Sequence, residues 1–173
     1  MIRELRVVAL TACLPGCSFV LDFSDSAGVH DAAIDAPYTP EQCAYKEPND
    51  TPATAAVIDP AVDMGPAAIC RPDKDAGVSE DDDYYKFAVP AGTTKVTITL
   101  TNGPMAGDLD LLLFGADGTS KLGQSRGFTA TETLICPGVS PACPSLAAGD
   151  YVFEVIPGAP GNLNSYTFSI TFN

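Results

Sequence analysis

The sequence has no tryptophan, one histidine and few basic residues, and these shortages exclude several classes of partner. Its 9 Lys and Arg stand against 22 Asp and Glu, which gives a formal net charge of −13. Nucleic acids and anionic lipid surfaces both require clustered positive charge, so neither is an expected partner. No apolar run approaches the ~20 residues that a transmembrane helix needs. The acidic balance instead favours divalent cations as ligands.

The N-terminus has the features of an export signal. MIRELRVVALTACLPGC starts with two arginines, continues with a short apolar run and ends in a small residue before cysteine. Both LTAC, ending at Cys13, and LPGC, ending at Cys17, resemble the bacterial lipoprotein signal, in which the cysteine becomes the lipidated first residue. We favour Cys17, because cleavage there leaves an even set of four cysteines for an oxidising compartment. Residues 1–16 are then the signal peptide.

Residues 17–42 are expected to form an acidic, flexible tether. The segment is rich in Ala and Asp and shows no sustained period of 3.6 or 2. The resemblance to lipoproteins implies a protein whose only membrane contact is its lipid, and Ser18 after the cysteine suggests the outer membrane. The location is then the outer membrane, the cell surface or the periplasm, with plain secretion as the alternative. His30 lies in this segment and is expected to be solvated.

Residues 43–173 alternate short apolar runs with glycine-containing turns, the pattern of an antiparallel β-sandwich. In KVTITLT, Val96, Ile98 and Leu100 share one face and three threonines share the other. YYKFAV, DLDLLLF, DYVFEVI and SYTFSITF alternate in the same way. The expected inward positions are Leu109, Leu111, Leu113, Val152 or Phe153, Val155, Phe168 and Ile170.

Four cysteines in this region are expected to form disulfides. They allow three pairings, of which we prefer the sequential one, Cys43 with Cys70 and Cys136 with Cys143. On the chain-entropy model the longer loop contributes roughly 3–4 kcal/mol and the shorter one roughly 2–3 kcal/mol. A zinc site is the competing interpretation, but the CxxC-type spacing that it needs is missing.

Two acidic clusters offer the oxygen ligands that calcium prefers. Glu47, Asn49 and Asp50 form the first, and the run DDD that contains Asp81 and Asp83 forms the second, just before a strand. A bridge from the first segment to Cys70 would carry the two clusters toward each other. The alternative is that both are solvated acidic turns.

The order of EPNDT, DDDYYKFAVPAG, GDLDLLLF, LAAGDYVFEV and SYTFSITF resembles the bacterial pre-peptidase C-terminal domain, a family that includes the collagen-binding domains of secreted collagenases. The likeness covers about residues 45–173. It implies a jelly-roll-like β-sandwich of about eight strands that is appended to secreted proteases and does no chemistry itself. Both cysteine pairs and the insert PGVSPACP lie outside the basic family pattern.

The resemblance assigns roles to individual residues. In calcium-binding members the EPN and DxDxY segments supply the ligands, and Glu47, Asn49, Asp50, Asp81 and Asp83 occupy the matching positions here. Tyr85 matches the aromatic position of the second segment. A further acidic residue often precedes the EPN glutamate by two positions, and Tyr45 stands there instead. In collagen-binding relatives exposed tyrosines on a sheet face contact the ligand. The candidates here are Tyr84, Tyr151 and Tyr166, for each of which a core position is the alternative.

The preferred function is a non-catalytic binding module that contacts an extracellular polymer or protein. We expect this module to be monomeric. The alternative is a structural or secretion-assisting domain that partners a separate protease or surface assembly. An enzyme is not expected, because the predicted fold has no histidine and the chain has no GxSxG or HExxH motif. Asp108 and Asp110 are spaced like an acid/base pair, but we expect them to be surface carboxylates that solubilise a strand.

Overall fold

A computed structural model describes residues 38–62, 64–70, 81–104 and 107–173. The predicted signal peptide, the lipidation site Cys17 and most of the predicted tether lie outside the described residues. The described part begins with a one-turn helix, α1 (Pro40–Cys43), which is capped by Thr39 and overlaps the end of the predicted tether. None of the helical structure in this part is long and apolar enough to cross a membrane.

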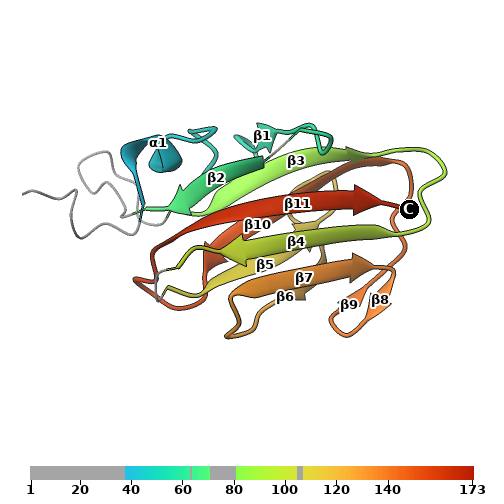
Figure 1. Cartoon of the computed structure of the whole chain (residues 1–173). Coiled ribbons are helices and arrows are strands. Elements are labelled where there is room, and N and C mark those ends of the chain that lie inside the picture. The colour runs from blue at the N-terminus through green and yellow to red at the C-terminus, as the bar shows by residue number, and fades with distance from the viewer. Residues whose placement is uncertain (1–37, 63, 71–80, 105–106) are drawn as a thin grey trace, which may run out of the picture. The chain divides into compact units, whose positions relative to one another are not determined.

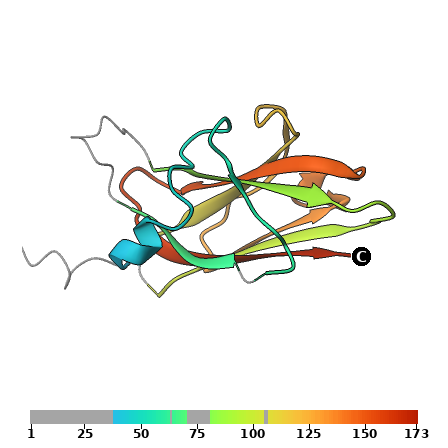
Figure 2. The ribbon, with the colours of Figure 1, turned by 90° about the horizontal axis from the view of Figure 1, so that it is seen from above.

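Two sheets packed face to face form the body of the fold (Figures 1 and 2). The five-stranded sheet has the order β1-β3-β10-β5-β6, and the four-stranded sheet has the order β2-β11-β4-β7. All the pairings are antiparallel except that of β1 with β3, which is parallel. The strands of the first sheet are β1 (Ala56–Val57), β3 (Asp83–Val89), β10 (Gly149–Pro157), β5 (Leu109–Phe114) and β6 (Lys121–Ser125). Those of the second are β2 (Met64–Ile69), β11 (Asn164–Phe172), β4 (Val96–Asn102) and β7 (Thr131–Cys136).

The sandwich prediction is confirmed, but the predicted number of strands was too low. The described residues contain eleven strands rather than about eight. Three of them are only two residues long, namely β1 and the pair β8 (Gly138–Val139) and β9 (Ala142–Cys143). Period-2 alternation becomes recognisable over about four residues or more, so strands this short leave no signal in the sequence.

The core lies between the two sheets and is formed by the alternating positions of their strands. Every position expected to point inward is buried there, with Phe153 rather than Val152 taking the core position on β10. Tyr85, Phe153 and Phe168 stack at its centre, with ring centroids 4.7 to 5.1 Å apart. Aromatic pairs at such distances contribute about 0.5–1.5 kcal/mol beyond the burial of their area.

The two disulfides follow the sequential pairing. Cys43–Cys70 joins α1 to the residue that follows β2, and Cys136–Cys143 joins β7 to β9. The insert PGVSPACP therefore forms the small β8–β9 hairpin, which lies beside β7 and β6 (Figure 1). The longer bridge joins the N-terminal segment to the end of β2, and Asp81, just before β3, contacts the same residue, Cys70.

Candidate metal centre

Three carboxylates from two distant segments meet at the start of β3. One oxygen each of Glu47, Asp81 and Asp83 lies within 4.8 Å of the other two. Glu47 is the most open of the three to solvent, and Asp83 is the most buried, with 2% of its surface exposed. The structure therefore brings together three of the five residues to which the resemblance assigned calcium binding.

Backbone hydrogen bonds hold the two segments in place. The N–H of Tyr84 donates to the carbonyl oxygen of Asn49 at 2.9 Å, which fixes the EPND segment against β3. The N–H of Cys70 donates to a carboxylate oxygen of Asp81. Because Cys70 also forms the disulfide with Cys43, the bridge and Asp81 are held at the same residue. The bridge was expected to draw the two acidic clusters together, and the contacts agree with that expectation.

Asn49 supplies a buried oxygen with no hydrogen-bond partner. The residue is fully buried, its N–H donates to Glu47 Oε2 at 2.9 Å, and its Nδ2 donates to the carbonyl oxygen of Tyr84 at 3.5 Å. Its Oδ1 accepts no hydrogen bond from any residue that the structure describes. Leaving a buried polar atom unsatisfied costs about 1–3 kcal/mol, so such an atom calls for a ligand.

Asp83 is held by Tyr166 from the core, and Tyr85 contacts Tyr166 in turn. The Tyr166 hydroxyl donates to Asp83 Oδ2, and the hydroxyl oxygens of Tyr85 and Tyr166 lie 2.8 Å apart. Sequence reasoning identified Tyr85 as the aromatic position of the motif but missed the link from Tyr166 to Asp83. Alternation along SYTFSITF indicates that Tyr166 points inward, but it does not reveal a partner 83 residues away.

The cluster holds its carboxyl groups in an environment that disfavours their charged form. Burial, with smaller contributions from Asp50 and Asp81, raises the pKa of Glu47 to about 6. Burial and the nearby charge of Asp50 raise the pKa of Asp81 to about 6 as well. The pKa of Asp83 is raised well above its usual range, chiefly by burial and then by Asp81 and Glu47. Near neutral pH the cluster therefore gains from a compensating positive charge.

The donor set fits a hard divalent cation. Three carboxylates are available, the side chain of Asn49 forms a hydrogen bond with Asp83 beside them, and Asp50 adds negative charge nearby. The cluster contains no histidine or cysteine. Calcium takes six to eight oxygen ligands and tolerates irregular geometry, whereas zinc prefers histidine and cysteine. Tyr45 stands where calcium-binding relatives often have another acid, and it packs against the core instead.

The three tyrosines considered for ligand contact lie in different environments. Tyr166 is buried, with 1% of its surface exposed, so the prediction that it contacts a ligand on a sheet face is wrong. Tyr151 packs against Phe87 and donates to the carbonyl oxygen of Ala147 at 3.1 Å. Tyr84 is half-buried and donates to Glu154. The three side chains do not form a shared exposed patch.

Asp110 is not the surface carboxylate that the alternation predicts. It is buried, with 3% of its surface exposed, and its Oδ2 accepts a hydrogen bond from Arg126 Nε at 2.7 Å. Leu112, on the same side of β5, is also buried, so both faces of this strand are covered. Asp108 is half-buried, and burial followed by the charges of Asp110 and Glu132 raises its pKa. Asp110 is therefore a buried carboxylate paired with the partly exposed Arg126, and Asp108 is only half-buried.

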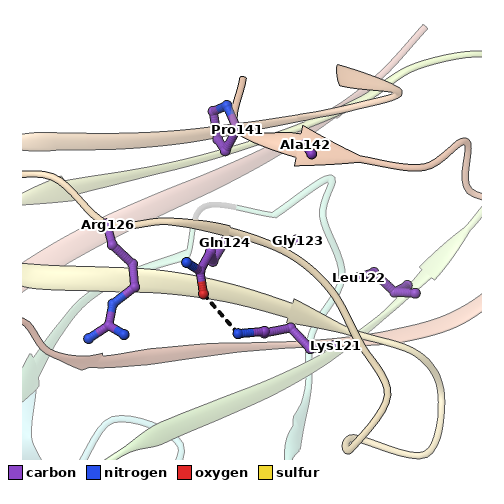
Figure 3. Close-up of a pocket in the computed structure, with 7 residues that line it drawn as sticks. All are labelled: Lys121, Leu122, Gly123, Gln124, Arg126, Pro141 and Ala142. Carbon is purple, nitrogen blue, oxygen red and sulfur yellow. Dashed lines mark hydrogen bonds between the residues drawn. The ribbon is translucent and has the colours of Figure 1, made fainter. Parts of the chain in front are cut away.

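A groove of roughly 510 Å³ lies between β6 and the β8–β9 hairpin, away from the carboxylate cluster. Figure 3 shows Lys121 and Arg126 on either side of Gln124, whose Oε1 accepts a hydrogen bond from Lys121 Nζ at 2.9 Å. Arg126 is already paired with Asp110. The groove holds no carboxylate, hydroxyl or sulfur side chain that could act as a metal ligand.

The fold and the site define a disulfide-linked β-sandwich module with an acidic cluster at one end. Residues 81–156 match the family model of the bacterial pre-peptidase C-terminal domain, which confirms the resemblance found in the sequence. The match begins at Asp81, so it includes Asp81 and Asp83 but not Glu47 and Asn49, which precede it in the sequence. The match is consistent with a non-catalytic role.

Two solved structures are among those to which the chain is similar. One is the pre-peptidase C-terminal domain of a collagenase from Bacillus anthracis, which is 16% identical, with 52% of this chain and 76% of that chain covered and a TM-score of 0.40. The other is PliG from Aeromonas hydrophila, a periplasmic inhibitor of g-type lysozyme, which is 15% identical, with 53% and 76% covered and a TM-score of 0.32. No curated protein matches the chain.

Proposed function

We propose that this protein is a non-catalytic binding module of the cell envelope that is ordered by calcium and contacts an extracellular polymer or protein. A lipid on Cys17 would anchor the module through the acidic tether, with the outer membrane as the preferred location. Calcium would bind at the carboxylate cluster of Glu47, Asp81 and Asp83. The family match and the two disulfides support an exported, extracytoplasmic module.

The buried Oδ1 of Asn49 is the single observation that carries the calcium proposal. Clustered carboxylates are common on acidic proteins and can be merely solvated. Asn49 Oδ1 is a fully buried amide oxygen without a hydrogen-bond partner. Asn102 Oδ1 also has no partner, but only Asn49 belongs to the segment that supplies Glu47. A cation would satisfy that oxygen and neutralise the carboxylates at the same time.

Calcium would act on structure rather than on chemistry. Glu47 and Asn49 belong to the N-terminal segment, whereas Asp81 and Asp83 belong to the start of β3. A cation shared by both would hold the segment that follows the tether against the sandwich. Because the chain contains clustered acidic side chains and few cations, calcium would also reduce repulsion at this end of the domain.

The proposal is tested by calorimetric titration of calcium into the chelator-stripped, lipid-free chain, residues 18–173, with thermal melts alongside. We expect binding in the micromolar to millimolar range and a stabilisation of about 2.7 kcal/mol when calcium exceeds its Kd a hundredfold. Glu47→Gln combined with Asp83→Asn should abolish both effects. Asp59→Asn removes an exposed carboxylate outside the cluster and should change neither. Absence of heat and of stabilisation would reduce the cluster to solvated turns.

A further inference from the structure

The outer face of the four-stranded sheet carries a regular array of hydroxyl groups. Outward positions on β4, β7 and β11 are occupied by Thr or Ser in every case but one, and Ile135 is the exception. We call these nine positions the hydroxyl face. They are Thr97, Thr99, Thr101, Thr131, Thr133, Ile135, Thr167, Ser169 and Thr171. Figure 1 looks onto this side of the sandwich, where β11, β4 and β7 lie in front.

The strand register arranges these side chains in three rows across the three strands. Each row takes one residue from β7, one from β4 and one from β11. The rows are Thr131–Thr101–Thr167, Thr133–Thr99–Ser169 and Ile135–Thr97–Thr171. Neighbouring strands in a sheet lie about 4.8 Å apart, and alternate residues along a strand about 6.7 Å apart, so the groups form a two-dimensional lattice.

The hydroxyl groups on this face are available and pre-ordered. All nine side chains are exposed or half-buried. Within the described part of the chain none of the eight hydroxyl side chains has a hydrogen-bond partner. Threonine is restricted at χ1, so a ligand that binds here immobilises little side-chain freedom. Each hydroxyl can both donate and accept a hydrogen bond.

The hydroxyl face is neutral, although the chain carries a net charge of −13. The three strands contain no Lys, Arg or Asp, and their one Glu, Glu132, is buried and accepts a hydrogen bond from Ser125 at 2.5 Å. A charged polymer would find no counter-charge here. A neutral partner could approach this face without meeting the carboxylates found elsewhere on the protein.

The composition of the face also distinguishes between neutral partners. Protein interfaces are enriched in Tyr, Trp, Arg and Met, and Ser and Thr rarely contribute strongly to their affinity. None of those four enriched residue types faces outward on β4, β7 or β11. Many similar, weak hydrogen-bonding groups in a lattice suit instead a partner with many similar hydroxyl groups on an ordered surface.

We propose that the hydroxyl face is the contact surface for an insoluble, neutral polysaccharide, an inference that rests on the proposed function as a binding module. Each hydrogen bond to a hydroxyl contributes little on its own, so binding depends on several contacts formed together. The same protein should therefore bind a solid polysaccharide and only weakly bind its soluble oligosaccharides.

The test is a depletion assay with the lipid-free chain, residues 18–173, and calcium present. The solids are microcrystalline cellulose, chitin, an insoluble β-1,3-glucan and fibrillar collagen. Thr99→Lys places a charge at the centre of the face, and Ala88→Lys adds the same charge to an exposed position on β3 of the other sheet. A triple Val variant of Thr97, Thr99 and Thr101 keeps the shape and β-propensity of the strand but removes three hydroxyls.

We expect at least one neutral polysaccharide to deplete the protein, including at about 0.5 M salt, where exposed charges are screened. Thr99→Lys and the triple Val variant should each bind about tenfold more weakly or worse, whereas Ala88→Lys binds like the parent. Equal effects of the two Lys variants would overturn the assignment of the face. Binding to collagen without binding to any polysaccharide would overturn this inference but support the binding module. Failure to bind any of the solids, with calcium bound, would count against both.

Discussion

Removal of calcium is expected to make the stability of this protein fall as the pH rises, which is unusual for an acidic domain. The cause is the cluster of Glu47, Asp81 and Asp83, whose pKa values are all raised in the folded state. A group with a raised folded-state pKa binds its proton more tightly when folded. Its contribution is therefore fully present below the unfolded-state pKa and is lost as the pH rises through the folded-state pKa.

The size of the effect follows from the two values near 6. In the unfolded state the pKa values of Asp and Glu are about 3.9 and 4.3. Each unit by which the folded-state pKa differs from these values corresponds to about 1.4 kcal/mol of stability. Asp81, with a pKa of about 6, then costs about 3 kcal/mol at neutral pH. Glu47, whose pKa is also about 6, is partly exposed to solvent, so we halve its contribution for screening. Its ionisation then costs about 1 kcal/mol more of stability at neutral pH. Part of this contribution is already lost at pH 4, which lies at the unfolded-state pKa values, so the calcium-free protein should lose about 3 kcal/mol of stability between pH 4 and pH 7.

Urea unfolding from pH 4 to pH 7.5, with chelator and with calcium, measures this loss. Glu47→Gln combined with Asp81→Asn is the control, because it removes both titrating groups and leaves the other carboxyls as they are. Asp117, whose pKa is lowered by hydrogen bonds from Ser120 and Thr119, then contributes equally to both proteins. Calcium should restore stability near pH 7 and have little effect near pH 4.5. A calcium-free parent whose stability is flat, or rises, relative to the control would refute the reasoning.

Three further substitutions test individual contacts. Asn49→Ala removes the unpartnered buried oxygen and should weaken calcium binding about tenfold, as measured by calorimetry; unchanged affinity would exclude Asn49 as a ligand. Tyr166→Phe removes the donor to Asp83 and should lower the free energy of unfolding by about 1–3 kcal/mol, which urea denaturation would detect. Arg126→Met leaves Asp110 buried without its partner and should cost about 3 kcal/mol at pH 7. Adding Asp110→Asn should recover most of that loss, and a double variant as unstable as the single one would contradict the pairing.

Much of the fold could be predicted because its signals are local. Alternation in KVTITLT and in the other long strands depends on neighbouring residues only, and the burial pattern of β4 follows it. The even number of cysteines and their spacing favoured the sequential disulfides. The longer bridge in turn makes the approach of EPND to Asp81 and Asp83 an expected consequence of the sequence.

The remaining features depend on contacts between residues far apart in the sequence. Alternation indicates that Asp110 faces away from the leucine side of its strand, but not that this second side is also covered or that Arg126 lies beside it. The same pattern turns Tyr166 inward without revealing its bond to Asp83. The unpartnered oxygen of Asn49 depends on how a loop packs against β3, and no motif encodes that. The rows of hydroxyl groups on the hydroxyl face can be recognised only when the pairing register of β7, β4 and β11 is known.

The measurement that tests the central claim most directly is a crystal structure of the mature chain grown with calcium, with anomalous differences used to locate the ion. We expect one calcium peak with oxygens of Glu47, Asp81 and Asp83 and the Oδ1 of Asn49 about 2.3–2.6 Å away. A calcium-saturated crystal with no peak at this cluster, or with Asn49 Oδ1 bound to a protein donor instead, would contradict the account.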